Sequence, residues 1–207
     1  SRFVIFEGIA DESAFSAADF LFATGALDVD TEGAVPQALT EAADRYVSSG
    51  AVDDDVQALD GNDALVTGAG NDSIAAGAGD EVVLAGAGDD LVDPGAGLNV
   101  ITLGAGDDTV VLDAADYAPG AFISNEITDY VAGATTIRIE GHGLTGFADL
   151  TFTAVPAGLV IGLGNSRFLT LTGIASADDL DPADFEFGAG TGTAPVFAGV
   201  GLAEDTG

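Results

Sequence analysis

Apolar positions recur every nine residues between residues 50 and 112, and the polar and glycine positions around them keep the same phase. The recurring apolar residues are Val56, Leu65, Ile74, Val83, Val92, Ile101 and Val110. Each would occupy a very short strand with its side chain pointing inward. A nine-residue unit cannot bury such a face by itself. Successive units must therefore stack, two to each coil, into a parallel solenoid.

Glycines and oxygen-bearing side chains precede each apolar position. The glycine pairs of the five most regular units are Gly68 and Gly70, Gly77 and Gly79, Gly86 and Gly88, Gly95 and Gly97, and Gly104 and Gly106. An acidic or amide residue follows at Asp54, Asp63, Asp72, Glu81, Asp90, Asn99 and Asp108. Alternate glycines allow a turn that other residues resist, and they leave carbonyl oxygens accessible to a ligand. Carboxylate and carbonyl oxygens together are the donors that calcium prefers, so the pattern predicts calcium sites in the turns.

The stretch from Gly68 to Ile74, Gly-Ala-Gly-Asn-Asp-Ser-Ile, resembles the nonapeptide of the repeats-in-toxin (RTX) calcium-binding β-roll family. One departure is systematic, because the first glycine of the family's repeat is replaced by Thr67, Ala76, Ala85, Pro94 and Leu103. The resemblance implies an all-β fold built on a parallel β-roll that binds several calcium ions. The expected metal ligands are Asp54, Asp63, Gly68, Gly70, Asp72, Gly77, Gly79, Glu81, Gly86, Gly88, Asp90, Asn99, Gly104, Gly106 and Asp108.

Residues 18 apart should lie on the same edge of such a roll, which gives two ladders of candidate ligands. One ladder contains Asp54, Asp72, Asp90 and Asp108, and the other contains Asp63, Glu81 and Asn99. The first ladder is entirely aspartate. In the second, the longer Glu81, the uncharged Asn99 and the apolar Leu98 should weaken binding. We therefore expect calcium between Asp72 and Asp90 and between Asp90 and Asp108, with lower occupancy on the opposite edge.

The composition agrees with this prediction and restricts the partners. The 207 residues include 35 acidic and 4 basic residues, for a net charge of -31, and no cysteine. Nucleic acid is an unsuitable partner because phosphate binding requires a basic surface. No apolar run has the length that membrane insertion requires. An extracellular chain without disulfides needs another means of stabilising its fold, and bound calcium would supply it. An acidic surface adapted to high salt would also explain the charge, but it would not place aspartates every nine residues.

The two ends of the chain share a second sequence repeat. Residues 2–22 align with residues 167–187 without a gap, and nine of the 21 positions are identical. The shared pattern resembles the end of the β-rich region that follows RTX repeats in type I-secreted proteins. Its presence at both ends favours a tandem array and head-to-tail self-association. The alternative is duplication within one domain, in which both ends fold back and the chain stays monomeric.

The remaining sequence predicts a β-rich region on either side of the roll. The predicted domains are an N-terminal strand motif (1–22), a linker with a capping helix (23–49), the RTX β-roll (50–112), a β-rich post-repeat domain (113–187) and a flexible or intersubunit tail (188–207). We expect strands at 3–6 and 20–22 and one amphipathic helix from Pro36 to Ser48. The later strands are predicted at Glu126–Tyr130, Thr135–Glu140, Leu150–Ala154, Gly158–Leu163 and Arg167–Thr172.

Enzyme chemistry has little basis in this sequence. His142 is the one histidine, and we expect it to be a surface residue. We expect the carboxylates outside the repeats, such as Asp178, Asp179, Asp181 and Asp184, to be capping or solvated groups. Two functions agree with the pattern. The first is a calcium-stabilised structural module of a secreted bacterial surface protein, such as an adhesin stalk, a surface layer or an extracellular filament. The second is the calcium-dependent secretion and folding domain of a type I-secreted enzyme, such as a serralysin-like protease.

Overall fold

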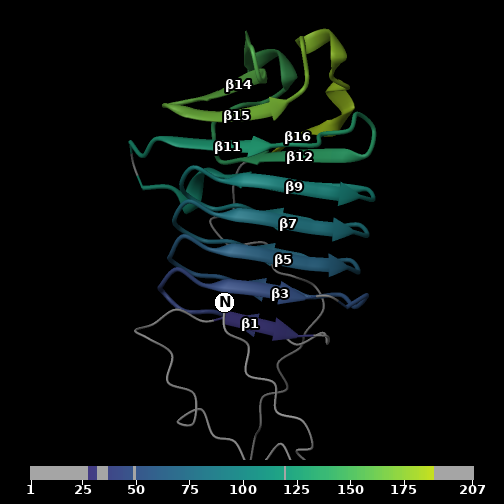
Figure 1. Ribbon diagram of the computed structural model, residues 1–207. Coiled ribbons are helices and arrows are strands. Elements are labelled where there is room, and N and C mark those ends of the chain that lie inside the picture. Colours follow the sequence, from purple (N-terminus) through teal and green to yellow (C-terminus); the bar gives the residue numbers. More distant parts are fainter. Residues whose placement is uncertain (1–27, 32–36, 49, 119, 189–207) are drawn as a thin grey trace, which may run out of the picture.

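The structure is a computed structural model that describes residues 28–31, 37–48, 50–118 and 120–188 (Figure 1). The described strands wind into two sheets. One has nine strands in the order β1-β3-β5-β7-β9-β11-β15-β14-β13, and the other has seven in the order β16-β12-β10-β8-β6-β4-β2. Figure 1 shows the coils stacked along one axis, with β1 at one end and the β14–β15 pair at the other.

The strands of the roll are short and nearly all parallel. The nine-stranded sheet contains β1 (Asp28–Thr31), β3 (Arg45–Ser48), β5 (Ala64–Ala69), β7 (Val82–Ala87), β9 (Val100–Ala105), β11 (Ile123–Ile127), β13 (Thr151–Val155), β14 (Gly158–Gly164) and β15 (Arg167–Thr172). The seven-stranded sheet contains β2 (Gln37–Ala38), β4 (Asp55–Gln57), β6 (Ser73–Ala75), β8 (Leu91–Asp93), β10 (Asp108–Asp113), β12 (Thr135–Glu140) and β16 (Phe185–Gly188). The described helices are single 3₁₀ turns: η3 (Ala114–Asp116), η4 (Phe147–Asp149), η5 (Ala177–Asp179) and η6 (Pro182–Asp184).

The register confirms the predicted coil of two nonapeptides. Leu65 pairs with Val83, and Val83 pairs with Ile101, in steps of 18 residues. In the opposite sheet Ile74 lies between Val56 and Val92 with the same step. All the recurring apolar residues from Val56 to Val110 are fully buried. The all-β parallel roll expected from the periodicity is therefore confirmed.

The helix predicted from Pro36 to Ser48 is wrong. Residues 37–38 and 45–48 form β2 and β3, which pair with β4 and β5 as an earlier coil of the same roll. Leu39 and Tyr46 lie in the core, and the turn between the strands is closed by Thr40, whose N–H and hydroxyl both donate to Asp44. The apolar spacing of this segment fits both a helix and the coil. Pairing with the neighbouring strand decides the outcome, because an isolated short helix is marginally stable.

The missing first glycine of each repeat has a structural reason. Its replacements Ala76, Ala85 and Leu103 are buried in the hydrophobic core, and Thr67 is fully buried with its hydroxyl donating to the carbonyl of Ala85. Pro94 is also buried. This position therefore points into the roll, where a side chain adds apolar contacts that glycine cannot supply.

The predicted post-repeat strands continue the same two sheets. Strands Thr135–Glu140 and Arg167–Thr172 have the predicted bounds, whereas the strand expected at Glu126–Tyr130 occupies Ile123–Ile127. β11 and β12 pair in parallel with β9 and β10. Among the described strands, the direction changes only at β13 and β14, which pair antiparallel with their neighbours. Residues 141–176, which contain β13, β14 and β15, form what we call the cap. The strands expected at 3–6 and 20–22 and the tail from residue 189 lie outside the described residues.

Candidate metal centre

One edge of the roll is formed by the turns that lead from the nine-stranded to the seven-stranded sheet. We call it the aspartate edge, because Asp54, Asp72, Asp90 and Asp108 stack on it, as expected. The backbone N–H of Asp54 donates to Oδ1 of Asp72 at 2.8 Å, and that of Asp72 donates to Oδ1 of Asp90 at the same distance. The N–H of Asp90 donates to Oδ1 of Asp108 at 3.0 Å. Asp72, Asp90 and Asp108 therefore each use one carboxylate oxygen to tie their coil to the preceding one.

The other oxygens of this ladder are the unusual feature of the edge. Oδ2 of Asp72 and of Asp90, and both carboxylate oxygens of Asp54, are buried without a hydrogen-bond partner in the described part of the chain. Burial, with repulsion by Asp72 and Asp108, raises the pKa of Asp90 to about 7, and burial raises the pKa of Asp72 and Asp108 as well. Buried acceptors without a donor are destabilising unless a cation or water satisfies them.

The glycines of the repeat bring backbone carbonyls close to these carboxylates. Gly86 has φ +122°, and a Cβ placed on it would overlap the carbonyl oxygen of Gly68, one coil earlier. A Cβ on Gly104 would likewise overlap the carbonyl oxygen of Gly86, and a Cβ on Gly88 would overlap that of Gly70. Any side chain here would push the coils apart. The glycines therefore keep a continuous row of carbonyl oxygens along each edge, as the repeat pattern predicts. On the opposite edge, Gly77 and Gly79 have the same left-handed backbone, as do Gly70, Gly88 and Gly106 on the aspartate edge.

The opposite edge, which we call the mixed edge, holds Asp63, Glu81 and Asn99 with a different pattern of contacts. The N–H of Glu81 donates to Oδ1 of Asn99 at 2.9 Å, and the Asn99 amide donates to the carbonyl of Pro94 and to Oδ1 of Asn125. Asn99 thus makes direct hydrogen bonds where an aspartate would keep a free oxygen. Both oxygens of Glu81 are buried without a described partner, and burial raises its pKa to about 8.

A second, exposed ladder was not anticipated from the sequence. On the aspartate edge the N–H of Asn71 donates to Asp53, that of Asp89 to Asn71, and that of Asp107 to Asp89. These bonds run in the direction opposite to the buried ladder, so each turn is held from both sides. The signal was the recurrent Asn or Asp immediately before each buried aspartate. On the mixed edge this ladder ends at Leu98, whose side chain has no oxygen to continue it.

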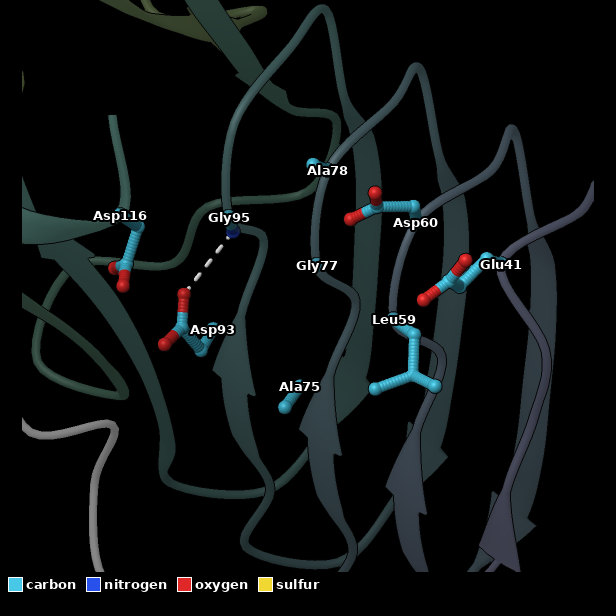
Figure 2. Close-up of a pocket in the computed structure, with 9 residues that line it drawn as sticks. All are labelled: Glu41, Leu59, Asp60, Ala75, Gly77, Ala78, Asp93, Gly95 and Asp116. Carbon is cyan, nitrogen blue, oxygen red and sulfur yellow. Dashed lines mark hydrogen bonds between the residues drawn. The ribbon is translucent and has the colours of Figure 1, made fainter. Parts of the chain in front are cut away.

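A hollow of about 360 Å³ lies beside the turns of the mixed edge. Figure 2 shows the carboxylates of Asp93 and Asp116 on one side of it and those of Asp60 and Glu41 on the other. Asp93 is buried and accepts from the N–H of Gly95 at 3.0 Å. Burial and the nearby Asp116 raise the pKa of Asp93 to about 7. Asp93 was not among the predicted site residues, because it occupies a position that holds Ala75 and Gln57 in the preceding coils.

Two side chains expected at the surface are partly or fully enclosed. His142 is half-buried, with its ring edge-on to Tyr117 at a centroid distance of 5.9 Å, and burial lowers its pKa. Asp184 is buried and accepts from the N–H of Gly133 and from the hydroxyl of Tyr130. Asp179 and Asp181 are capping groups, as predicted.

The side chains on each edge would not complete a calcium site by themselves, so backbone carbonyl oxygens would have to act as further ligands. Within the described residues, no group of three or more acidic or histidine side chains converges on one point. The free carboxylate oxygens of adjacent coils and the glycine carbonyls lie on the same edge, however, and both kinds of oxygen are hard donors. The donor chemistry and the buried, unpartnered oxygens therefore fit a calcium ion better than a softer metal.

Comparison with known proteins agrees with this chemistry. Residues 52–92 and 95–116 match the RTX calcium-binding nonapeptide repeat in four copies. The roll is thus built of RTX calcium-binding repeats. No curated protein matches the chain. Of the described helices, none is long and apolar enough to cross a membrane.

Proposed function

We propose that the chain is a calcium-stabilised structural module of a secreted bacterial surface protein, such as an adhesin stalk, a surface layer or an extracellular filament. The observation that carries the proposal is the row of buried carboxylate oxygens between successive coils that have no hydrogen-bond partner in the described part of the chain. A fold with such a row is incomplete without cations. Their regular spacing also gives these carboxylates a repeated structural role, which favours a module with no catalytic activity.

The proposed mechanism is folding coupled to calcium binding. Without calcium the roll combines many carboxylates with glycine-rich turns, so charge repulsion and chain entropy both oppose folding. Bound calcium supplies positive charge between the stacked carboxylates. Asp72, Asp90 and Asp108 on the aspartate edge, together with carbonyls such as those of Gly68 and Gly86, would hold the ions. On the mixed edge Asp63 and Glu81 would do so more weakly, since Asn99 is engaged in hydrogen bonds.

A calcium titration followed by circular dichroism tests this proposal. Asp90→Asn should raise the calcium concentration at the folding midpoint, because it removes charge and changes one of the two carboxylate oxygens. Asp149→Asn is the matched control, since Asp149 is exposed in the cap and its carboxylate accepts from Thr145. An unchanged midpoint for Asp90→Asn would contradict the ligand assignment. In crystals grown with calcium, equal occupancy on the mixed edge would contradict the proposed difference between the edges.

We also propose that the chain is secreted and assembles head to tail. RTX repeats are typical of type I-secreted proteins, and calcium outside the cell would then trigger folding after export. The copies of one motif at residues 2–22 and 167–187 support a tandem, head-to-tail array. The parent gene separates the two functions. Tandem copies about 165 residues apart would support a surface array, whereas an upstream catalytic domain would support the secretion domain of an enzyme.

A further inference from the structure

Within the described residues, the cap strand β13 forms one edge of the nine-stranded sheet. β13 (Thr151–Val155) pairs with β14, and no other described strand lies on its outer side. In an antiparallel strand, alternate residues direct their N–H and C=O groups to the same neighbour. β13 therefore presents a row of backbone donors and acceptors without a described partner, which is a template for another strand.

This edge lacks the features that usually prevent strand addition. Its sequence, Thr-Phe-Thr-Ala-Val, contains no charge, proline or glycine. Thr151, Thr153, Ala154 and Val155 are exposed, whereas Phe152 packs on Phe147 with ring centroids 5.2 Å apart. The strand is thus anchored to the core on one face and open along its edge. Natural edge strands usually carry a lysine, a proline or a bulge at such a place.

The distribution of charge selects the occupant. Residues 141–176 carry only Asp149 and Arg167 as charged side chains, in a chain whose net charge is -31. The acidic segment 178–186 lies nearby, because Phe147 packs on both Phe152 and Phe185, but β13 itself is uncharged. Two copies can therefore approach along β13, away from the acidic edges of the roll. The exposed apolar residues Val82, Leu84 and Val100 form a different surface, but it lies between the two rows of acidic turns. A second copy meeting that face would bring the acidic rows together.

We propose that β13 is a self-association edge, where β13 of a second copy adds antiparallel and joins the two nine-stranded sheets. Full overlap of the two five-residue strands sets Thr153 opposite its equivalent across a twofold axis. The contact is isologous, so it closes at two copies. It joins the cap ends of two stacks and is therefore distinct from head-to-tail association through the chain ends. It also lies outside the calcium-binding repeats, so it does not depend on the ligand assignment.

A single introduced cysteine tests the register in the full-length chain. The chain has no cysteine, so Thr153→Cys places one thiol at the proposed axis. Opposed residues of an antiparallel pair lie about 4.5–5.5 Å apart between Cα atoms, which a disulfide spans. In millimolar calcium and mild oxidant we expect a covalent dimer. Ala64→Cys, an exposed position on β5, is the matched control and should stay monomeric. Cross-linking of Ala64→Cys with none at Thr153→Cys would overturn the proposal in favour of the sheet face.

Sedimentation equilibrium gives the second measurement. Thr153→Glu opposes two carboxylates at the axis, and like charges in contact across an interface should raise the dimer dissociation constant by about tenfold or more. Thr153→Ser should leave it unchanged, and Ala64→Glu adds the same charge away from the edge. Matching circular dichroism and calcium midpoints show that the variants fold. A wild-type chain that stays monomeric at high concentration, with no Thr153→Cys dimer, would overturn the proposal and leave residues 1–27 or 189–207 as candidates to cover the edge.

Discussion

The repeat coils and the cap share one pair of sheets, yet their carboxylates find partners in different ways. Residues 50–112 carry thirteen acidic side chains and no basic one, whereas residues 141–176 carry one of each sign. In the coils, several buried carboxylate oxygens have no hydrogen-bond partner among the described residues. In the cap, the carboxylate of Asp149 is satisfied by the N–H and hydroxyl of Thr145. In the proposed function, calcium would supply the coil carboxylates with the partners that Asp149 of the cap obtains from Thr145.

Withdrawal of calcium should produce the largest difference in stability between the coils and the cap. At a free calcium concentration a hundred times the dissociation constant, each site contributes about 2.7 kcal/mol to stability. Chelation should therefore expose the amides of β5, β7 and β9 to hydrogen exchange while those of β14 and β15 remain protected for longer. Exchange measured by mass spectrometry checks this. If both regions lose protection at the same rate, they form one cooperative unit and the comparison fails.

Glycine substitutions should distinguish the close-packed turns of the coils from the open turn of the cap. Gly86 and Gly164 both have positive φ, at +122° and +80°. An added Cβ meets the Gly68 carbonyl in the first case and nothing within 4 Å in the second. Backbone strain alone costs roughly 1–3 kcal/mol. Gly164→Ala should stay in that range, whereas Gly86→Ala should exceed it in urea unfolding at saturating calcium. Equal losses would mean that the coils can separate without cost.

The sequence predicted the glycine-rich coils better than the segments on either side of them, for a physical reason. A nine-residue period repeats the same local signal, so Ile74 and Ile101 could be assigned to the core from their phase alone. The segment around Tyr46 lacks the glycines, and its spacing also fits a helix, so only pairing with β5 identifies it as a strand. The burial of Asp184 could not be predicted either, because its partners Tyr130 and Gly133 lie about 50 residues away in the sequence.

The stacking of the candidate ligands could be predicted from the sequence, but most of their hydrogen bonds could not. The buried ladder follows from the spacing of Asp72 and Asp90. The exposed ladder through Asn71 and Asp89 depends on backbone N–H directions that the sequence does not encode locally. The engagement of Asn99 with Asn125 requires β11 to follow β9 in the sheet, which is a tertiary result.

Truncation of the core should affect both regions alike and independently of calcium. Ile101 and Leu169 are fully buried, in a coil and in the cap respectively. Replacing either with alanine should lower the free energy of unfolding by about 2–5 kcal/mol. The loss for Ile101→Ala should persist at saturating calcium, since it removes packing and leaves the ligands in place. Urea unfolding at several calcium concentrations checks this. A loss that disappears in excess calcium would mean that Ile101 acts through the metal sites.

The pH dependence should have opposite signs in the two regions when calcium is absent. Burial raises the pKa of Glu81 to about 8, well above the roughly 4.3 of an unfolded glutamate. The folded coil therefore binds the proton more tightly than the unfolded chain does. This contribution is fully present below pH about 4, and it is lost as the pH rises through about 8. In the cap, hydrogen bonds from Thr145 lower the pKa of Asp149, so that contribution is present at neutral pH and is lost in acid.

Hydrogen exchange in chelator at pH values from 5 to 8, corrected for the intrinsic exchange rate, measures both effects. Protection of β7 should fall as the pH rises, and Glu81→Gln should flatten this slope because the amide does not titrate. Protection of β14 should not fall over the same range. A β7 slope of the opposite sign would mean that the Glu81 carboxylate is stabilised as an anion without calcium. Its buried oxygens would then have a cationic or hydrogen-bonding partner other than the metal, and the distinction between coil and cap would no longer rest on calcium.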